Sequence, residues 1–305
     1  MTRPTIRIGT RGSPLALVQA RMVETLLHQA QTDLETEIVI IKTTGDKVRD
    51  RPLAEIGGKG LFTKELDAAL VAGDISCAVH SMKDMETALA DGIAIGAVLT
   101  REDPRDAFLS PVADGINDLP EGAVVGTTSL RRQAQILDRR SDLSVVTFRG
   151  NVDTRLKKLD AGDVQATLLA MAGLNRLGRD DVGAVPLEPD EMLPAAAQGA
   201  VAVTVKSGDT AMAETVAALD HAVTNLCVTA ERAFLAVLDG TCKTPIAALA
   251  QLEGDDRIRL RGLVATPDGT VKRVGTRTAP AADIADAARD LGAELKAAMG
   301  DRMPR

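Results

Sequence analysis

Two stretches of this chain repeat one order of apolar strand, turn and helix. Residues 7–19 (RIGTRGSPLALVQ) and 124–135 (VVGTTSLRRQAQ) each place Gly-Thr after an apolar segment, and a serine follows, Ser13 or Ser129. Serine at that point is typical of a helix N-cap. Residues 66–84 and 155–173 share a second pattern, in which an amphipathic helix ends in Ala-Gly-Asp before a buried strand and a turn. The repeats predict two related α/β halves.

Strands and helices alternate here at a spacing typical of doubly wound parallel sheets, which bind ligands at the carboxyl ends of their strands. Residues 101–110 (REDPRDAFLS) are a charged joint that contains proline, and 193–205 (LPAAAQGAVAVTV) are predicted to include a strand that returns to the first half. We therefore predict two hinged α/β lobes with a cleft between them, resembling periplasmic binding proteins. The first lobe would comprise residues 1–100 and 199–219, and the second residues 101–198.

The pattern changes after about residue 220 to one helix, three strands of alternating polarity and a closing helix. These elements predict a small C-terminal α+β domain, residues 220–305, with a three-stranded antiparallel sheet. Residues 43–60 are rich in glycine and charge and are predicted to form a mobile loop near the cleft.

Composition excludes several classes of protein. The chain has 305 residues, a formal net charge of −7, no Trp or Tyr and four Phe, so the aromatic platforms and basic surface of a nucleic-acid-binding protein are missing. No apolar run approaches the roughly 20 residues that span a bilayer, and no signal-peptide pattern opens the chain. Three cysteines and three histidines lack zinc-binding spacing. We expect a cytoplasmic monomer without metal that binds neither nucleic acid nor membranes.

Several cations lie at the predicted ligand edge, on turns or first helical turns. Arginine suits bidentate recognition of carboxylate or phosphate, although any single one could be a solvated surface charge. Cations at a helix N-terminus oppose the helix dipole unless an anion joins them. Neither a phosphate-binding loop nor a dinucleotide-binding turn occurs. A ligand with several carboxylates is therefore predicted for Arg11, Arg131, Arg132, Arg149 and Arg155, with Lys83 after its strand.

Two further side chains could carry chemistry. Cys77 and Cys227 fall on a buried strand and an apolar helix face and are predicted core residues. Cys242 is on a loop beside Lys243, which favours thiolate, so it is either a covalent attachment point or an inert loop cysteine. Asp84, near His80 and Lys83 at a strand end, is either a reacting carboxylate or only a surface or capping one.

Specific motifs recur in order from end to end: RIGTRGSPLAL, GGKGLFTKEL, AVHSMKD, REDPRDAF, VGTTSLRRQAQ, FRGNVDTRL, LAMAGLNRLG, LPAAAQGA, TAERAFL and the loop around Cys242. With them the whole chain resembles the porphobilinogen deaminase family, also called hydroxymethylbilane synthases, of haem and other tetrapyrrole biosynthesis. The resemblance implies a transferase that binds dipyrromethane, made from two porphobilinogens, through a thioether to Cys242. Four further porphobilinogens are joined, each losing ammonia, and hydrolysis releases hydroxymethylbilane.

The same resemblance implies the roles of individual residues. Asp84 would be the catalytic carboxylate, stabilising the cationic pyrrole left by ammonia and then accepting a proton. The implied cofactor contacts besides Cys242 are Ser13, Lys83, Asp84, Thr127, Ser129, Arg131, Arg132, Arg149, Gly150 and Arg155. The implied contacts of porphobilinogen and the growing chain are Arg11, Ser13, Phe62, Arg149, Arg155, Arg176 and Gln198.

Two other functions would fit two hinged lobes. A solute-binding or ligand-sensing protein would hold a dicarboxylate without chemistry, but neither a signal peptide nor a helix-turn-helix segment is recognised in the sequence. An arginine-lined phosphotransferase would need the phosphate loop that is missing.

Overall fold

The computed structural model describes residues 5–47, 60–239 and 244–304. The chain forms two compact units, one of Met1–Glu102 and Gly199–Asn225, the other of Asp103–Gln198 and Leu226–Arg305. Each unit contains a five-stranded sheet with helices, and the second also contains a three-stranded antiparallel sheet. The predicted α/β class with an α+β C-terminal part is confirmed. The division into three domains stays a prediction.

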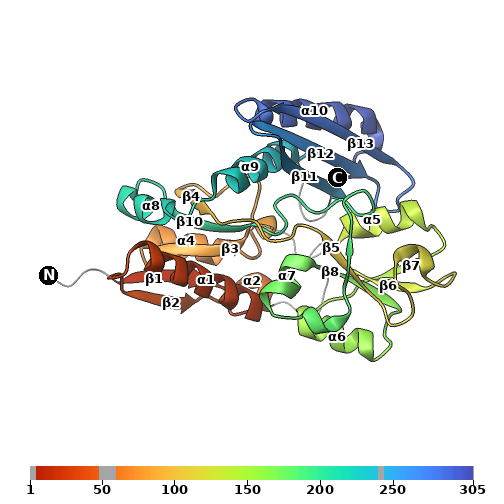
Figure 1. Ribbon diagram of the computed structural model, residues 1–305, viewed down its shortest axis with the longest axis horizontal. Helices are drawn as coiled ribbons and strands as arrows, with labels where there is room; N and C mark the ends of the chain where they lie inside the picture. The colour runs from red at the N-terminus through yellow and green to blue at the C-terminus, as the bar shows by residue number, and fades with distance from the viewer. Residues whose placement is uncertain (1–4, 48–59, 240–243, 305) are drawn as a thin grey trace. The chain divides into compact units, whose positions relative to one another are not determined.

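The sheet of the first unit has the strand order β2-β1-β3-β10-β4 (Figure 1). Its strands are β1 (Ile6–Thr10), β2 (Thr36–Ile40), β3 (Cys77–Ser81), β4 (Ile93–Val98) and β10 (Val201–Lys206). The helices of this unit are α1 (Pro14–Ala30), α2 (Thr44–Lys47), α4 (Lys64–Ala72) and α8 (Thr210–Ala217).

The sheet of the second unit has the strand order β7-β6-β8-β5-β9. Its strands are β5 (Asp106–Leu109), β6 (Val124–Gly126), β7 (Ser144–Val146), β8 (Ala166–Ala170) and β9 (Val185–Leu187). Three helices connect these strands, namely α5 (Leu130–Arg139), α6 (Val152–Asp160) and α7 (Met171–Arg176).

The two sheets have the same topology, as the repeats predict, but each is mixed rather than fully parallel. β10 runs antiparallel to β3 and β4, and β5 runs antiparallel to β8 and β9. Both strands follow a point where the chain passes from one unit to the other. They are therefore not products of a βαβ crossover, which is what makes neighbouring strands parallel. Four of the ten residues of the predicted joint at 101–110 form the buried strand β5, Asp106–Leu109.

Local signals set the repeated turns. The hydroxyl of Ser13 accepts the Ala16 backbone N–H at 3.3 Å at the start of α1, and Ser129 does the same for Arg132 at 3.4 Å at the start of α5. Gly73 and Gly162 follow α4 and α6 with φ of 79° and 78°, a left-handed conformation that glycine adopts without strain. The serine caps and the Ala-Gly-Asp helix ends are thus as predicted.

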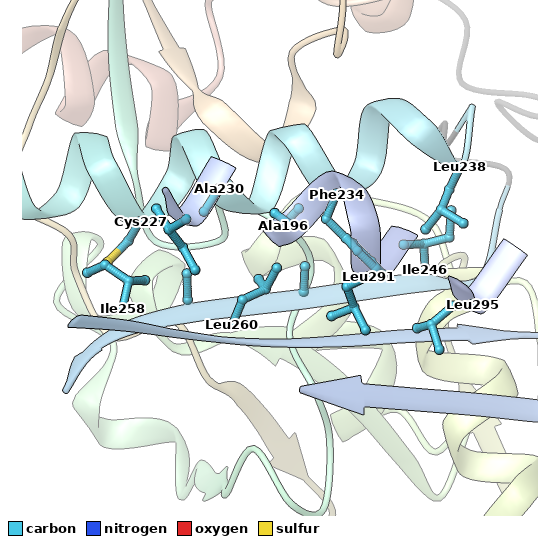
Figure 2. Packing of buried hydrophobic residues seen from close by; sticks show 14 of the residues in the cluster. Ala196, Cys227, Ala230, Phe234, Leu238, Ile246, Ile258, Leu260, Leu291 and Leu295 are labelled. Atoms are coloured by element: carbon cyan, nitrogen blue, oxygen red, sulfur yellow. The ribbon is translucent and has the colours of Figure 1, made fainter. Parts of the chain in front are cut away.

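The C-terminal part consists of α9 (Ala222–Val237), which begins in the first unit, β11 (Ile246–Glu253), β12 (Arg257–Ala265), β13 (Lys272–Pro280) and α10 (Ile284–Met299). Cys227, Ala230 and Phe234 of α9 pack with apolar residues of the sheet and of α10, including Leu260 and Leu291 (Figure 2). This confirms Cys227 as a core residue.

The other face of this sheet packs on the second lobe. Ala247, Leu249 and Leu263 share a core with Ala134 of α5 and with Leu193. Because this contact is apolar and buried, the C-terminal sheet and the second lobe form one unit. Within the described residues, no helix is long and apolar enough to cross a membrane.

Candidate functional site: a pocket lined by a carboxylate and a buried arginine cluster

A pocket opens in the first unit where β1 and β3 end. Arg11, Ser13 and Phe62 line one part of it. His80 and Ser81 of β3, and Asp84 of the turn after β3, line the other part. The carboxyl ends of parallel strands meet at one edge of the sheet, so segments about seventy residues apart converge there. The structure thus brings four predicted site residues together, Arg11, Ser13, Phe62 and Asp84.

Asp84 is the last residue of a short 3-10 helix, Met82–Asp84, that follows β3. Its partly buried carboxylate lines the pocket and makes no hydrogen bond or ion pair with any described residue. The structure therefore does not support a capping role. Lys83 belongs to the same turn and is also partly buried.

Arg11 contacts Asp46 and Phe62 in this unit. Its guanidinium binds Asp46 through Nη2 to Oδ1 at 2.5 Å and Nε to Oδ2 at 3.2 Å, and it lies over the Phe62 ring at 4.0 Å. Burial by itself raises the pKa of Asp46, but hydrogen bonds from Arg11 and Thr43 hold that pKa below its ordinary value. The sequence did not predict Asp46 as a site residue, because its position in a charged segment was the only signal for it.

His80 forms part of the pocket wall as a neutral residue. Its Nε2 lies 3.0 Å from the Thr204 hydroxyl in β10, and the side chain is buried. Burial, together with the charge of Arg11, lowers the pKa of His80 to about 4. Near pH 7 it therefore contributes a hydrogen bond and no charge.

Arg131 and Arg132 open α5 in the second unit, and both bind one carboxylate. Asp106 of β5 accepts Arg131 Nη1 on Oδ2 at 2.6 Å and Arg132 Nη2 on Oδ1 at 2.6 Å. All three side chains are buried, with 0% exposure for Asp106. Burial alone raises the pKa of Asp106, but the charges of Arg131 and Arg132 lower it far below its usual range. An internal anion thus joins the arginine pair that opposes the helix dipole.

A further cationic group lies at the FRGN turn and the first turn of α6. Arg149 Nη1 is buried without a hydrogen-bond partner in the described part of the chain. Arg155 donates its Nε–H to the Gly150 carbonyl at 3.1 Å. Burial and the charges of Arg132 and Arg149 lower the pKa of Arg155 to about 10. A polyanionic ligand would relieve the repulsion among these desolvated cations.

Gly150 makes the turn possible. Its φ is 135°, and a Cβ atom there would lie 2.6 Å from a methyl carbon of Thr154. The next residue, Asn151, caps α6 by accepting the Thr154 N–H at 2.9 Å. Any other residue at 150 would displace Arg149 relative to Arg155.

The remaining predicted residues have mixed placements. Thr127 is buried after β6, and its hydroxyl oxygen accepts the Ser129 backbone N–H at 3.1 Å. The Ser129 hydroxyl oxygen accepts the Arg132 N–H, so in both of these bonds the hydroxyl acts as acceptor and keeps its hydrogen for donation. Arg176 ends α7 and is partly buried. Gln198 is buried, and its amide donates to the Pro104 carbonyl at 2.8 Å and to Asp106 Oδ1 at 3.0 Å.

Cys242, predicted to carry the cofactor, and most of the predicted loop 43–60 lie outside the described residues; the part of that loop at Thr44–Lys47 is the short helix α2. Cys77 is buried in β3, as predicted, and burial raises the pKa of its thiol to about 12. Such a thiol does not supply thiolate near neutral pH. Among the described side chains, no group of three His, Cys, Asp or Glu could hold a metal ion.

These features are typical of a class of protein that binds a polyanionic ligand, since buried guanidiniums lie together in one unit and a carboxylate lines a pocket in the other. The sequence matches the porphobilinogen deaminase dipyrromethane cofactor binding domain over residues 6–214 and the porphobilinogen deaminase C-terminal domain over residues 225–301. The chain belongs to the porphobilinogen deaminase family.

Curated relatives agree with this assignment over nearly the whole chain. Porphobilinogen deaminase of Paracoccus denitrificans is 55% identical over 95% of this chain and 93% of its own length. The chloroplastic porphobilinogen deaminase of Oryza sativa is 53% identical over 97% of this chain and 84% of its own length. The predicted family, enzyme class and dipyrromethane cofactor are confirmed.

Solved structures show weaker likeness. The periplasmic VFT2 domain of Bordetella pertussis BvgS is 16% identical, with a TM-score of 0.42 over 71% of this chain and 86% of that domain. At that TM-score the likeness supports no conclusion about this chain.

Proposed function

We propose that this chain joins four porphobilinogen molecules head to tail on a dipyrromethane held by Cys242 and releases hydroxymethylbilane and ammonia. The observation that carries the proposal is the surplus of buried positive charge in the second unit. Arg149 has a buried Nη1 without a partner among the described residues, and Arg155 is repelled by its arginine neighbours. Each pyrrole of the ligand bears an acetate and a propionate, so its carboxylates match these guanidiniums.

The residues of the second unit fit such a cofactor. Arg149 and Arg155 would bind carboxylates directly, Gly150 keeps them in register, and Ser129 and Thr127 have hydroxyl hydrogens to donate. Arg131 and Arg132 would add positive charge, and those of their N–H groups that do not bond Asp106 would be donors to the cofactor. When bound, the dipyrromethane supplies the pyrrole to which the first porphobilinogen is joined.

The residues of the first unit would act on the substrate. Asp84 would stabilise positive charge on the pyrrole of porphobilinogen as ammonia leaves and would then accept a proton. Its carboxylate is suited to this because no described residue already neutralises it. Lys83 and Ser13 would bind carboxylates of the cofactor, and Arg11 and Ser13 those of the substrate. Phe62 would contact the substrate as well.

The roles of Arg176 and Gln198 in binding the incoming substrate or the elongating product rest on the family resemblance. We also propose that the protein works as a cytoplasmic monomer without metal, nucleic acid or membrane. The two rival functions, solute binding and phosphate transfer, have no support from the family match.

Intact-protein mass spectrometry tests the central point. Purified protein should be heavier than its sequence by one dipyrromethane, and Cys242→Ser should lose that mass. Cys77→Ala is the matched control, because Cys77 is buried in β3 and should leave the added mass unchanged. An added mass that survives in Cys242→Ser would refute this attachment site.

A further inference from the structure

Asp106 was not among the predicted site residues, yet it lies at the centre of the arginine pair. Its carboxylate accepts five contacts: two from Arg131, two from Arg132 and one from the Gln198 amide. Four of these contacts reach Oδ1 and one reaches Oδ2, and the side chain has 0% exposure. A carboxylate that bonds two guanidiniums and has no exposed surface is not placed to act as an acid, a base or a ligand contact.

The guanidiniums are also held from their other sides by backbone carbonyls. Arg131 Nη1 donates to the Leu193 carbonyl at 2.8 Å, and Arg132 Nη1 donates to the Leu168 carbonyl at 2.7 Å. A planar guanidinium bound on two edges cannot rotate. Both arginines are therefore oriented before any ligand arrives.

The balance of charge gives a second reason why a carboxylate is needed at position 106. Without Asp106, two adjacent guanidiniums would be buried at a helix N-terminus with no described carboxylate bonded to either. With it, the pair carries a surplus of one positive charge. That surplus extends to the FRGN turn, since the charge of Arg132 helps to lower the pKa of Arg155.

We propose that Asp106, completed by Gln198, is a positioning residue that orients Arg131 and Arg132 for the carboxylates of the cofactor and limits their charge. The inference rests on the proposed function, and it gives Gln198 a role through Asp106 in addition to the substrate contact that the family resemblance implies. Preorganised donors lose less entropy on binding than mobile ones. The resulting gain in binding free energy should appear as a larger fraction of molecules that acquire the cofactor.

The first experiment is Asp106→Asn in the full chain, which keeps the shape of the side chain and removes its charge. Intact-mass spectrometry gives the fraction of molecules that carry dipyrromethane, and thermal unfolding gives the folded fraction. We expect loading per folded molecule to fall at least tenfold and to recover partly at high porphobilinogen concentration. In the loaded molecules, KM for porphobilinogen should rise more than kcat falls.

The control is Leu119→Ala, a buried apolar truncation in the same lobe that is destabilising; the Leu119 carbonyl accepts a hydrogen bond from Arg140, and its side chain belongs to the apolar core rather than to the hydrogen-bond network of Arg131 and Arg132. It should load normally per folded molecule. Normal loading in folded Asp106→Asn would overturn the proposal. Wild-type protein without dipyrromethane would instead overturn the proposed function, so the two failures are distinguishable.

A second measurement does not depend on the folding of Asp106→Asn. In Cys242→Ser protein with ¹⁵N-labelled arginine, the Arg132 Nε–H, which bonds Asp106 at 3.1 Å, should be rigid and exchange slowly with solvent. Its signal would be assigned by its loss in Arg132→Lys. Arg289, an exposed arginine of α10, gives the reference for a mobile side chain. An Arg132 signal as mobile as that of Arg289 would overturn orientation before binding.

Discussion

Arg155 should destabilise the protein when the cofactor is absent, because it is held charged in a place that disfavours charge. Burial and the charges of Arg132 and Arg149 lower its pKa to about 10, from an ordinary value of 12.5. At about 1.4 kcal/mol per pH unit, the charged form costs about 3 kcal/mol relative to the unfolded chain. The folded pKa is depressed and the group stays protonated, so this cost applies across the physiological range and lessens only near pH 10 and above.

Replacing Arg155 by Gln removes the charge together with two favourable contributions. The hydrogen bond to the Gly150 carbonyl is worth about 1 kcal/mol, and the shorter apolar stem loses about another 0.8 kcal/mol per buried methylene. The net expectation is a gain of about 1 kcal/mol, or roughly 2–4 °C in melting temperature.

The assay is thermal unfolding in a Cys242→Ser background, which keeps the protein free of cofactor. Cys242→Ser with Arg155→Gln should melt above Cys242→Ser alone, whereas Arg155→Lys, which keeps the charge, should not. The exposed Arg289→Gln is the matched control and should change stability by less than about 0.5 kcal/mol. With Cys242 intact, Arg155→Gln should lower cofactor loading or elongation at least tenfold.

A lower melting temperature for Arg155→Gln than for Arg155→Lys would refute this reasoning, since it would mean that the charge at 155 is stabilised by the fold. A gain in stability with a loss of function would show that the electrostatic repulsion within the cationic cluster is retained because ligand binding requires these charges.

Two further predictions concern the pocket of the first unit. Asp84→Asn should fold normally and lower ammonia release per cofactor-loaded molecule by on the order of 10²-fold, while Asp84→Glu keeps partial activity; full activity in Asp84→Asn would remove this carboxylate from the mechanism. His80 has a folded pKa of about 4 against 6.5 in the unfolded chain, so between these values the unfolded chain binds more protons and stability is lost as the pH is lowered. Urea unfolding should show that His80 accounts for a loss of about 2 kcal/mol from pH 7 to pH 5, which His80→Asn removes; an equal loss in that variant would contradict the assignment.

The sequence by itself determined the local parts of this protein. Ser13 and Ser129 predicted where α1 and α5 begin, and Gly73 and Gly162 predicted where α4 and α6 end, because capping and left-handed turns depend on neighbouring residues. The repeat of these signals predicted two α/β lobes. The motifs predicted the family, because they extend through the whole chain.

Only the tertiary structure decided the partners of the charges. Asp106 lies 25 residues before Arg131 and looked like part of a charged joint, yet it is wholly buried in β5. Arg11 likewise finds Asp46 35 residues away. Such pairs depend on which strands are neighbours, and the antiparallel placement of β5 between β8 and β9 has no local signal. Spacing therefore predicted that anions would join the arginines, and the sheet determined that one of those anions is the protein's own carboxylate.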